Sequence, residues 1–148
     1  ALDSGALRMY VADFPVPELA EHPAVRLMPH LGASTDEAEE NCAVMAADQL
    51  SDFLENGNIV NSVNFPRVRL ARTNAYRLAL TNRNVPKALG NITSVLADRN
   101  INVVDMLNQS RESVAYNLID IETMPDDGLL EDLRAIDSVI NVQVFDRP

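Results

Sequence analysis

The sequence predicts a chain in two parts, an α/β segment followed by an α+β domain of the ferredoxin-like type. In residues 75–148, runs with strand-like alternation and runs with helical periodicity follow one another as strand–helix–strand–strand–helix–strand. That order is typical of a split βαβ arrangement, an antiparallel four-stranded sheet with both helices on one face. Before it, two short strand-like runs precede one long amphipathic pattern, which favours an α/β unit.

In the first part, the clearest element is a long helix over residues 35–56. Ser34 and Glu37 have the spacing of a capping box, and Gly57 is a candidate left-handed C-cap. Three shorter elements are expected before the helix, namely a strand at 9–12, a helical turn at 18–21 and a strand at 25–28. Apolar and small residues recur at three- and four-residue steps and predict one buried stripe: Ala38, Cys42, Met45, Ala46, Gln49, Leu50, Phe53 and Leu54.

Residues 58–74 are polar and irregular, and we interpret them as a linker with one extended piece at 59–63. The elements expected after the linker are strands at 76–80, 101–109, 114–122 and 139–145 and helices at 86–99 and 129–136. The predicted domains are therefore 1–57, 58–74 and 75–148. A sheet of this kind has edge strands and one uncovered face, so we expect a homodimer through this domain.

Composition excludes several classes of function. The 148 residues have no run of eighteen apolar residues, so no membrane span is expected, and no signal peptide is visible. Cys42 is the single cysteine, which excludes an internal disulfide and a Cys/His zinc site and favours a reducing, cytoplasmic compartment. The net charge of −10 disfavours nucleic acid and anionic membranes. The chain opens at Ala1, which suggests a piece of a longer protein.

The basic residues are unevenly distributed. The stretch from Arg67 to Lys87 holds six of the twelve lysines and arginines. Two interpretations are open, a solvated face of the linker or a patch that binds anions.

Two motifs resemble the D-2-hydroxyacid dehydrogenase family. Residues 29–35, Pro-His-Leu-Gly-Ala-Ser-Thr, and the acidic residues after them resemble the catalytic histidine motif, in the form typical of the 3-phosphoglycerate dehydrogenase branch. Residues 13–18, Asp-Phe-Pro-Val-Pro-Glu, resemble the acidic segment of that family. The second half is similar to an ACT domain, a module that senses small molecules. The resemblance implies that residues 1–57 are the end of an incomplete Rossmann-like, NAD-binding domain.

The resemblance also implies roles for individual residues. His30 would be the base that takes the hydroxyl proton of 3-phosphoglycerate while hydride passes to NAD, because histidine exchanges protons near neutral pH. Glu18 would pair with the second ring nitrogen of His30, and Asp13 would hold the nicotinamide carboxamide. The backbone from His30 through Leu31 and Gly32 to Ala33 would pass against the cofactor. A different 2-hydroxy acid as the substrate remains an alternative.

Other residues receive structural interpretations. From composition alone, a histidine after proline is usually a loop residue, and it is the motif that makes His30 a candidate. His22 is expected to be structural, and Cys42 to pack in the core. The chain contains no G-x-G-x-x-G motif for a pyrophosphate, and the family's substrate-binding arginine is absent. We therefore expect this chain alone to be inactive and not to bind NAD appreciably.

The second half carries a candidate effector site. In the ACT pattern a small amino acid such as L-serine lies between two copies, and the matching residues here are Asn82, Asn84 and Asn102. Carboxamides donate and accept hydrogen bonds, which suits a zwitterion. The pattern has glycine where this chain has Lys87, which either closes the site or contributes an ammonium group. The alternative is an ACT domain that serves only oligomerisation.

Overall fold

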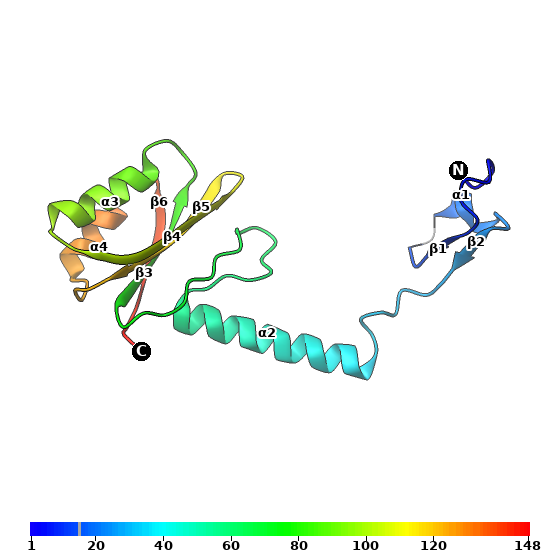
Figure 1. Cartoon of the computed structure of the whole chain (residues 1–148), viewed down its shortest axis with the longest axis horizontal. Helices are drawn as coiled ribbons and strands as arrows, with labels where there is room; N and C mark the ends of the chain where they lie inside the picture. The colour runs from blue at the N-terminus through cyan, green and yellow to red at the C-terminus, as the bar shows by residue number, and fades with distance from the viewer. Residues whose placement is uncertain (15) are drawn as a thin grey trace. The chain divides into compact units, whose positions relative to one another are not determined.

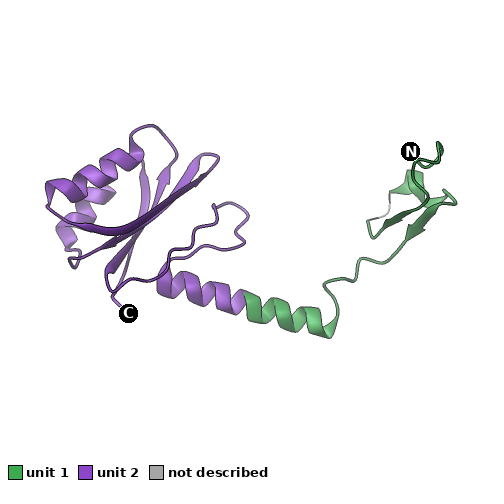
Figure 2. Ribbon diagram, in the orientation of Figure 1, with its two compact units in different colours: residues 1–45 green, residues 46–148 purple. Residues whose placement is uncertain are grey.

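The computed structural model describes residues 1–14 and 16–148, which form two compact units, residues 1–45 and 46–148 (Figure 2). Each unit has its own sheet. The domain boundaries predicted from the sequence, 1–57, 58–74 and 75–148, stay a prediction.

The first unit is built on two short parallel strands. Strand β1 (Tyr10–Ala12) pairs with β2 (Val25–Leu27), and helix α1 (Pro17–Ala20) lies between them in sequence. Pro17 stands in the first turn of α1, where its missing N–H leaves no hydrogen bond unmade. The predicted strands and helical turn are confirmed to within one residue at their ends.

Helix α2 (Asp36–Asn56) is confirmed, but the predicted capping box is wrong. Thr35 takes the capping position, where its Oγ1 accepts a hydrogen bond from the N–H of Ala38 at 3.2 Å. The N–H of Ser34 instead donates to the carbonyl of Leu31 in a turn. The reason is the start of the helix at Asp36, which places the third helical N–H over Thr35. At the other end Gly57 has a φ of 70°, as predicted for a left-handed C-cap.

The predicted burial of the α2 stripe is not observed in this chain. None of its 21 residues is buried, Leu54 is 64% exposed, and Cys42 is exposed rather than packed in a core. The periodicity gives the helix one apolar side, but burial of that side requires a second layer. Of the stripe, only Phe53, in the last turn, joins a hydrophobic cluster of the described residues. The stripe is therefore an apolar surface on this chain.

The second unit has the predicted ferredoxin-like topology (Figure 1). Its elements are β3 (Tyr76–Arg83), α3 (Ala88–Asp98), β4 (Val103–Arg111), β5 (Val114–Ile121), α4 (Asp127–Arg134) and β6 (Val139–Phe145). The sheet order is β4-β5-β3-β6, and each neighbouring pair is antiparallel. Helix α4 starts two residues earlier than predicted because Asp126 caps it, accepting from the N–H of Leu129 at 2.7 Å.

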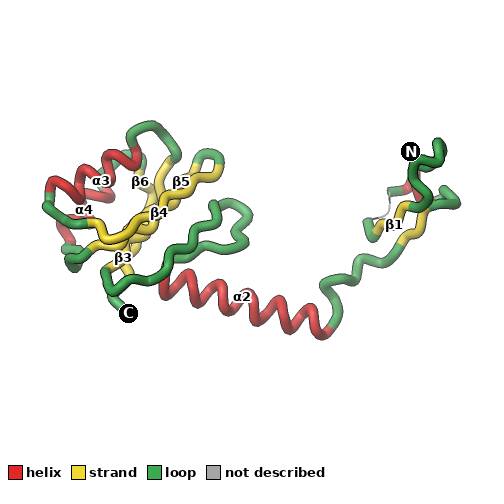
Figure 3. The backbone as a smooth tube through the Cα atoms, in the orientation of Figure 1, coloured by secondary structure: helices red, strands yellow, loops and turns green. Residues whose placement is uncertain are grey.

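The two helices cover one face of this sheet, as Figure 3 shows. The core between helices and sheet consists of Leu78, Leu80, Ile92, Leu96, Ile119, Ile121, Leu129, Leu133 and Val142. Alternation along β3 and β5 sends every second side chain to this layer. This is the hydrophobic core that the sequence pattern predicts.

The opposite face of the sheet is covered as well, which corrects the expectation of an open face. Residues 58–74 fold back over it, held as a hairpin by the antiparallel bridge between Ile59 and Val68. A second cluster fills the space beneath: Ile59, Val68, Ala79, Tyr116 and Leu118, with Phe53, Phe65, Leu70, Leu107 and Phe145 packed against them. The segment interpreted as a linker is thus an integral layer of the second unit.

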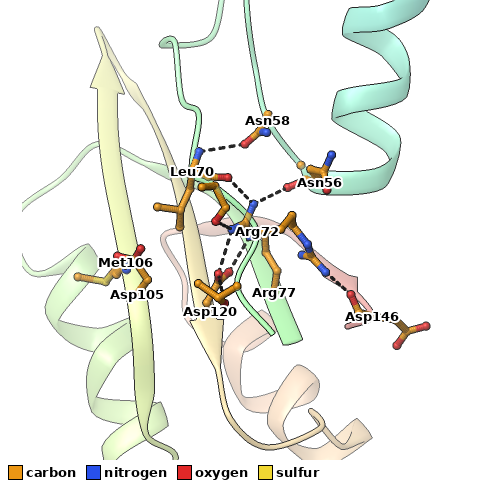
Figure 4. A network of polar contacts seen from close by, with 12 residues as sticks. Asn56, Asn58, Leu70, Arg72, Arg77, Asp105, Met106, Asp120 and Asp146 are labelled. Carbon is orange, nitrogen blue, oxygen red and sulfur yellow. Dashed lines mark hydrogen bonds and ion pairs between the residues drawn. The ribbon is translucent and has the colours of Figure 1, made fainter. Parts of the chain in front are cut away.

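A buried ion pair fixes that layer to the sheet (Figure 4). Arg77 of β3 and Asp120 of β5 are register partners, both essentially unexposed, with Nε 2.6 Å from Oδ1. Nη2 also donates to Asp120 Oδ2 at 2.9 Å, and the other three guanidinium hydrogens go to the carbonyls of Asn56, Leu70 and Ala71 at 2.8–3.1 Å. The basic stretch is therefore not a uniformly solvated face, because one of its six cations is fully buried.

Candidate functional site

The candidate catalytic site lies where the two parallel strands of the first unit end. Asp13 follows β1 directly, and His30 comes three residues after β2. Since parallel strands place their carboxyl ends at the same edge, the two side chains meet there. His30 Nδ1 lies 2.9 Å from Asp13 Oδ2, and the two side chains are 54% and 48% exposed. The ring of Phe14 packs against the imidazole, with centroids 4.2 Å apart.

Glu18, expected beside His30, is not its partner in this structure. It lies in the first turn of α1, and no hydrogen bond or ion pair joins it to His30 among the described residues. Asp13 occupies the place instead because it leaves β1 at the strand edge. The signal was present in the sequence, since two predicted short strands with a helical turn between them suggest a parallel pair whose ends converge.

This arrangement can support proton transfer. With the ring proton on Nδ1, His30 donates to the Asp13 carboxylate, which fixes the tautomer and leaves Nε2 as an acceptor. A histidine oriented by a carboxylate in this way is the usual form of a general base. His22 also lies beside a carboxylate, with its Nε2 3.2 Å from Asp3 Oδ1. Its Nδ1 accepts from the N–H of Ala24 at 3.1 Å, so both ring nitrogens of His22 have partners within the unit, as expected of a structural residue.

The residues expected to line the cofactor form a turn after His30. The N–H of Leu31 donates to the carbonyl of Pro29, and the turn continues through Gly32 and Ala33, all of them exposed. A Cβ built on Gly32 would meet no atom of the described residues within 4 Å, so the part of the chain that the structure describes leaves the space beside that backbone open. In residues 1–14 and 16–148, no three His, Cys, Asp or Glu side chains gather as metal ligands would.

Asn82, the first residue of the candidate effector site, is committed to internal contacts. It is 2% exposed, its Oδ1 accepts from Nδ2 of Asn117 at 2.7 Å, and its own Nδ2 donates to the carbonyl of Arg83 at 2.7 Å. Asn117 in turn donates to the carbonyl of Leu80. In this chain the Asn82 carboxamide therefore joins β3 to β5 through hydrogen bonds.

Asn84 and Asn102 remain exposed, but they lie at opposite ends of the sheet. The N–H of Asn84 donates to the carbonyl of Ser113 just before β5, whereas the carbonyl of Asn102 accepts from the N–H of Glu122 just after it. Asn84 ties the loop after β3 to the β4–β5 turn, since its Nδ2 donates to the carbonyl of Glu112 at 3.0 Å. Lys87 precedes α3 with a φ of 70°. The chain thus keeps a left-handed backbone, of the kind that favours glycine, while carrying a lysine there.

None of the helices in the described part of the chain is both long and apolar enough to cross a lipid bilayer.

No family model matches the chain. Curated proteins do match it. It is 33% identical over 128 residues to D-3-phosphoglycerate dehydrogenase of Haemophilus influenzae, covering 86% of this chain and 31% of that protein. It is 32% identical over 129 residues to the Escherichia coli K12 protein of the same name, covering 86% and 32%.

A third relative is D-3-phosphoglycerate dehydrogenase 2 of Saccharomyces cerevisiae, 36% identical over 112 residues, covering 72% of this chain and 24% of that protein. The chain spans about a third of the length of the bacterial relatives. Among solved structures, the chain matches the ACT domain from GTP pyrophosphokinase of Chlorobium tepidum with a TM-score of 0.41 and 17% identity. The match covers 49% of this chain and 100% of the chain in that structure.

The topology places the second unit in the ferredoxin-like class, the fold expected of an ACT domain. Within the first unit, a carboxylate-paired histidine stands at the edge of a parallel strand pair. The sequence comparisons then agree with the resemblance drawn from the motifs: along most of its length, the chain is similar to D-3-phosphoglycerate dehydrogenases.

Proposed function

We propose that this chain is part of an NAD-dependent 3-phosphoglycerate dehydrogenase, which oxidises 3-phosphoglycerate to 3-phosphohydroxypyruvate in serine biosynthesis. The observation that carries the proposal is the paired His30 and Asp13 at the strand edge, inside a motif shared with that family and in a chain related to those enzymes along most of its length. The alternative of another 2-hydroxy acid would leave this pairing unchanged.

In the proposed site, His30 accepts the proton of the substrate hydroxyl at Nε2. Asp13 holds the ring by its bond to Nδ1 and stabilises the positive charge that forms on the imidazole. The backbone of Leu31 and Gly32 would flank the nicotinamide cofactor, which supplies the hydride acceptor when bound. Glu18 then has a solvated position in α1, rather than the pairing expected from the motif.

A matched pair of variants tests which carboxylate orients His30. The neutral imidazole should hold its proton mainly on Nδ1, as read from the ring ¹⁵N chemical shifts. Asp13→Asn should lower the population of this tautomer, whereas Glu18→Gln should leave it as in the wild-type chain. The opposite ranking would restore Glu18 as the partner and overturn the role of Asp13.

The chain alone is expected to be inactive. It contains one half of an acid–base pair but no G-x-G-x-x-G motif, and general acid–base help alone contributes only about 10²–10⁴-fold to a rate. Enzymes of ordinary efficiency require at least about 10⁶-fold. Steady turnover of 3-phosphoglycerate with NAD by the purified chain would contradict this expectation.

For the second unit we propose a regulatory role, in which two copies pair and hold a small amino acid such as L-serine between them. Asn84 and Asn102 are both exposed. Because they lie at opposite ends of the sheet in one copy, Asn84 of one copy and Asn102 of the second would hold the ligand. Strands β4 and β6 are the sheet edges, and β4 carries Val104 and Met106 at 46% and 38% exposure. Apolar edge strands are suited to pairing with a second copy.

A second candidate function is assembly without sensing. Two observations favour it, the internal hydrogen bonds of Asn82 and the lysine side chain at position 87. The two functions are separated by mapping backbone amide resonances during an L-serine titration. A sensor shows saturable changes centred on Asn84 and Asn102 that Asn84→Ala removes. An assembly module shows none, while its mass in solution remains that of a dimer.

A further inference from the structure

A polar cavity lies on the face of the sheet that residues 58–74 cover, between two hairpins of the second unit. One hairpin is formed by residues 58–68, and the other is the tight turn that joins β4 to β5 (Figures 1 and 3). They are tied by Arg111, whose Nη1 donates to the carbonyl of Ser62 at 3.2 Å. The cavity has a volume of about 480 Å³. It is distinct from the residues proposed for catalysis and for the effector.

The charge of the lining is opposite to that of the chain. The cavity is lined by Asn61, Ser62, Phe65, Pro66, Arg67, Gln109, Ser110 and Arg111. It thus contains two guanidinium groups, two hydroxyls, two carboxamides and no carboxylate, in a chain with a net charge of −10. The nearest carboxylate in sequence is Glu112, in the turn beyond Arg111.

The two arginines are available to a ligand. Among the described residues, neither forms an ion pair, although Arg69, Arg77, Arg83 and Arg99 each do. No hydrogen bond to the Arg67 side chain is present among those residues, and Arg111 uses one nitrogen on Ser62. A guanidinium has five N–H donors in a planar fork that matches a carboxylate or a phosphate.

The loop that carries Arg67 is held in shape. The Ser62 hydroxyl accepts from the N–H of Phe65 at 3.1 Å and donates to Oδ1 of Asn64 at 2.9 Å. Phe65 packs edge-on against Tyr116, with ring centroids 6.0 Å apart. Because this backbone is already ordered, binding an anion would require little further loss of conformational entropy.

We propose that this cavity binds a small oxyanion, the carboxylate or phosphate group of a metabolite, between Arg67 and Arg111. Of the six basic residues in the stretch from Arg67 to Lys87, only Arg67 belongs to this anion site. The second arginine of the site, Arg111, comes from β4. The site is independent of the proposed enzyme activity, since its lining belongs to the second unit alone.

The test is a calorimetric titration of the full chain with inorganic phosphate and, separately, with malonate, at constant ionic strength set by chloride. The variants are Arg67→Gln and Arg111→Gln. The control is Arg69→Gln, which removes the same charge from the same segment but does not line this cavity. Thermal melting shows whether Arg111→Gln still folds, and Arg67→Lys tests whether charge alone suffices.

We expect saturable binding of at least one of the two anions, weakened about tenfold or more by either variant and retained in Arg69→Gln. A preference for phosphate or malonate assigns the chemical source of the anion. Absence of saturable binding, or equal weakening by all three glutamine variants, would overturn the proposal. A loss of L-serine binding is not expected from Arg67→Gln, so failure here is distinguishable from failure of the proposed regulatory function.

Discussion

The hydroxyl of Tyr116 joins the sheet to the end of α2. It donates to the carbonyl of Gly57 at 2.8 Å from a nearly buried position in β5. Burial raises the pKa of Tyr116 to about 12, and the nearby Arg77 guanidinium opposes that rise. The neutral phenol is thus the form that the folded state favours.

This pKa predicts a loss of stability in alkaline solution. An unfolded tyrosine ionises near pH 10, whereas the folded one holds its proton to about pH 12. Between these pH values the folded chain binds more protons than the unfolded chain. The free energy of unfolding therefore falls as pH rises, by roughly 2–3 kcal/mol in total. Tyr116→Phe should lose about 1 kcal/mol at neutral pH and show a smaller fall. Urea denaturation at pH 8 to 11.5 measures both, and an unchanged pH profile in the variant would contradict the assignment.

The backbone of Lys87 carries a second residue-scale prediction. Lys87 has a left-handed backbone, a conformation that costs a residue with a Cβ about 1–2 kcal/mol. Glycine avoids this cost, but it loses more conformational entropy on folding, which cancels part of the gain. Lys87→Gly should therefore stabilise the chain by about 0.5–1 kcal/mol, and Lys87→Ala should change little. Thermal denaturation of the three proteins compares them. Destabilisation by the glycine variant would mean that the lysine side chain contributes contacts that outweigh the strain.

At the scale of elements, the main contact is between the segment 58–74 and the sheet. Arg77→Ala leaves the Asp120 carboxylate buried without its counter-charge and frees three carbonyls. The expected cost is about 3–5 kcal/mol. The matched control is Arg83→Ala, from the same strand, whose partner Asp137 is almost fully exposed, and it should cost at most about 1 kcal/mol. Similar losses for both variants in urea denaturation would show that the buried pair does not hold this layer.

The order of elements after residue 75 could be predicted because each helix and strand there repeats apolar residues at its own period. The fold of 58–74 could not, since Ile59 and Val68 are isolated apolar residues in a polar stretch and carry no periodicity. The burial of Arg77 could not be predicted either, because the alternation of side chains along a strand assigns a charged residue to a solvated face. At the candidate site, the motif indicated His30 and Asp13, but their pairing depends on the parallel register of β1 and β2.

At the scale of the whole chain, two surfaces of the described residues lack a partner. The α2 stripe exposes Met45, Leu50 and Leu54, and the edge strands β4 and β6 have free backbone groups. The proposed parent enzyme and the proposed dimer would each cover one of them. The chain thus combines the pair of side chains proposed for proton transfer with a ferredoxin-like domain for which we propose a regulatory role.

The most direct measurement is calorimetric titration of L-serine into the full chain, with its mass in solution determined by sedimentation at the same concentration. We predict saturable binding of L-serine to a dimer, and Asn84→Ala should abolish it. At 100 times its dissociation constant the ligand should also stabilise the fold by about 2.7 kcal/mol. A chain that stays monomeric and binds neither L-serine nor any other amino acid would contradict the regulatory role assigned to the second unit.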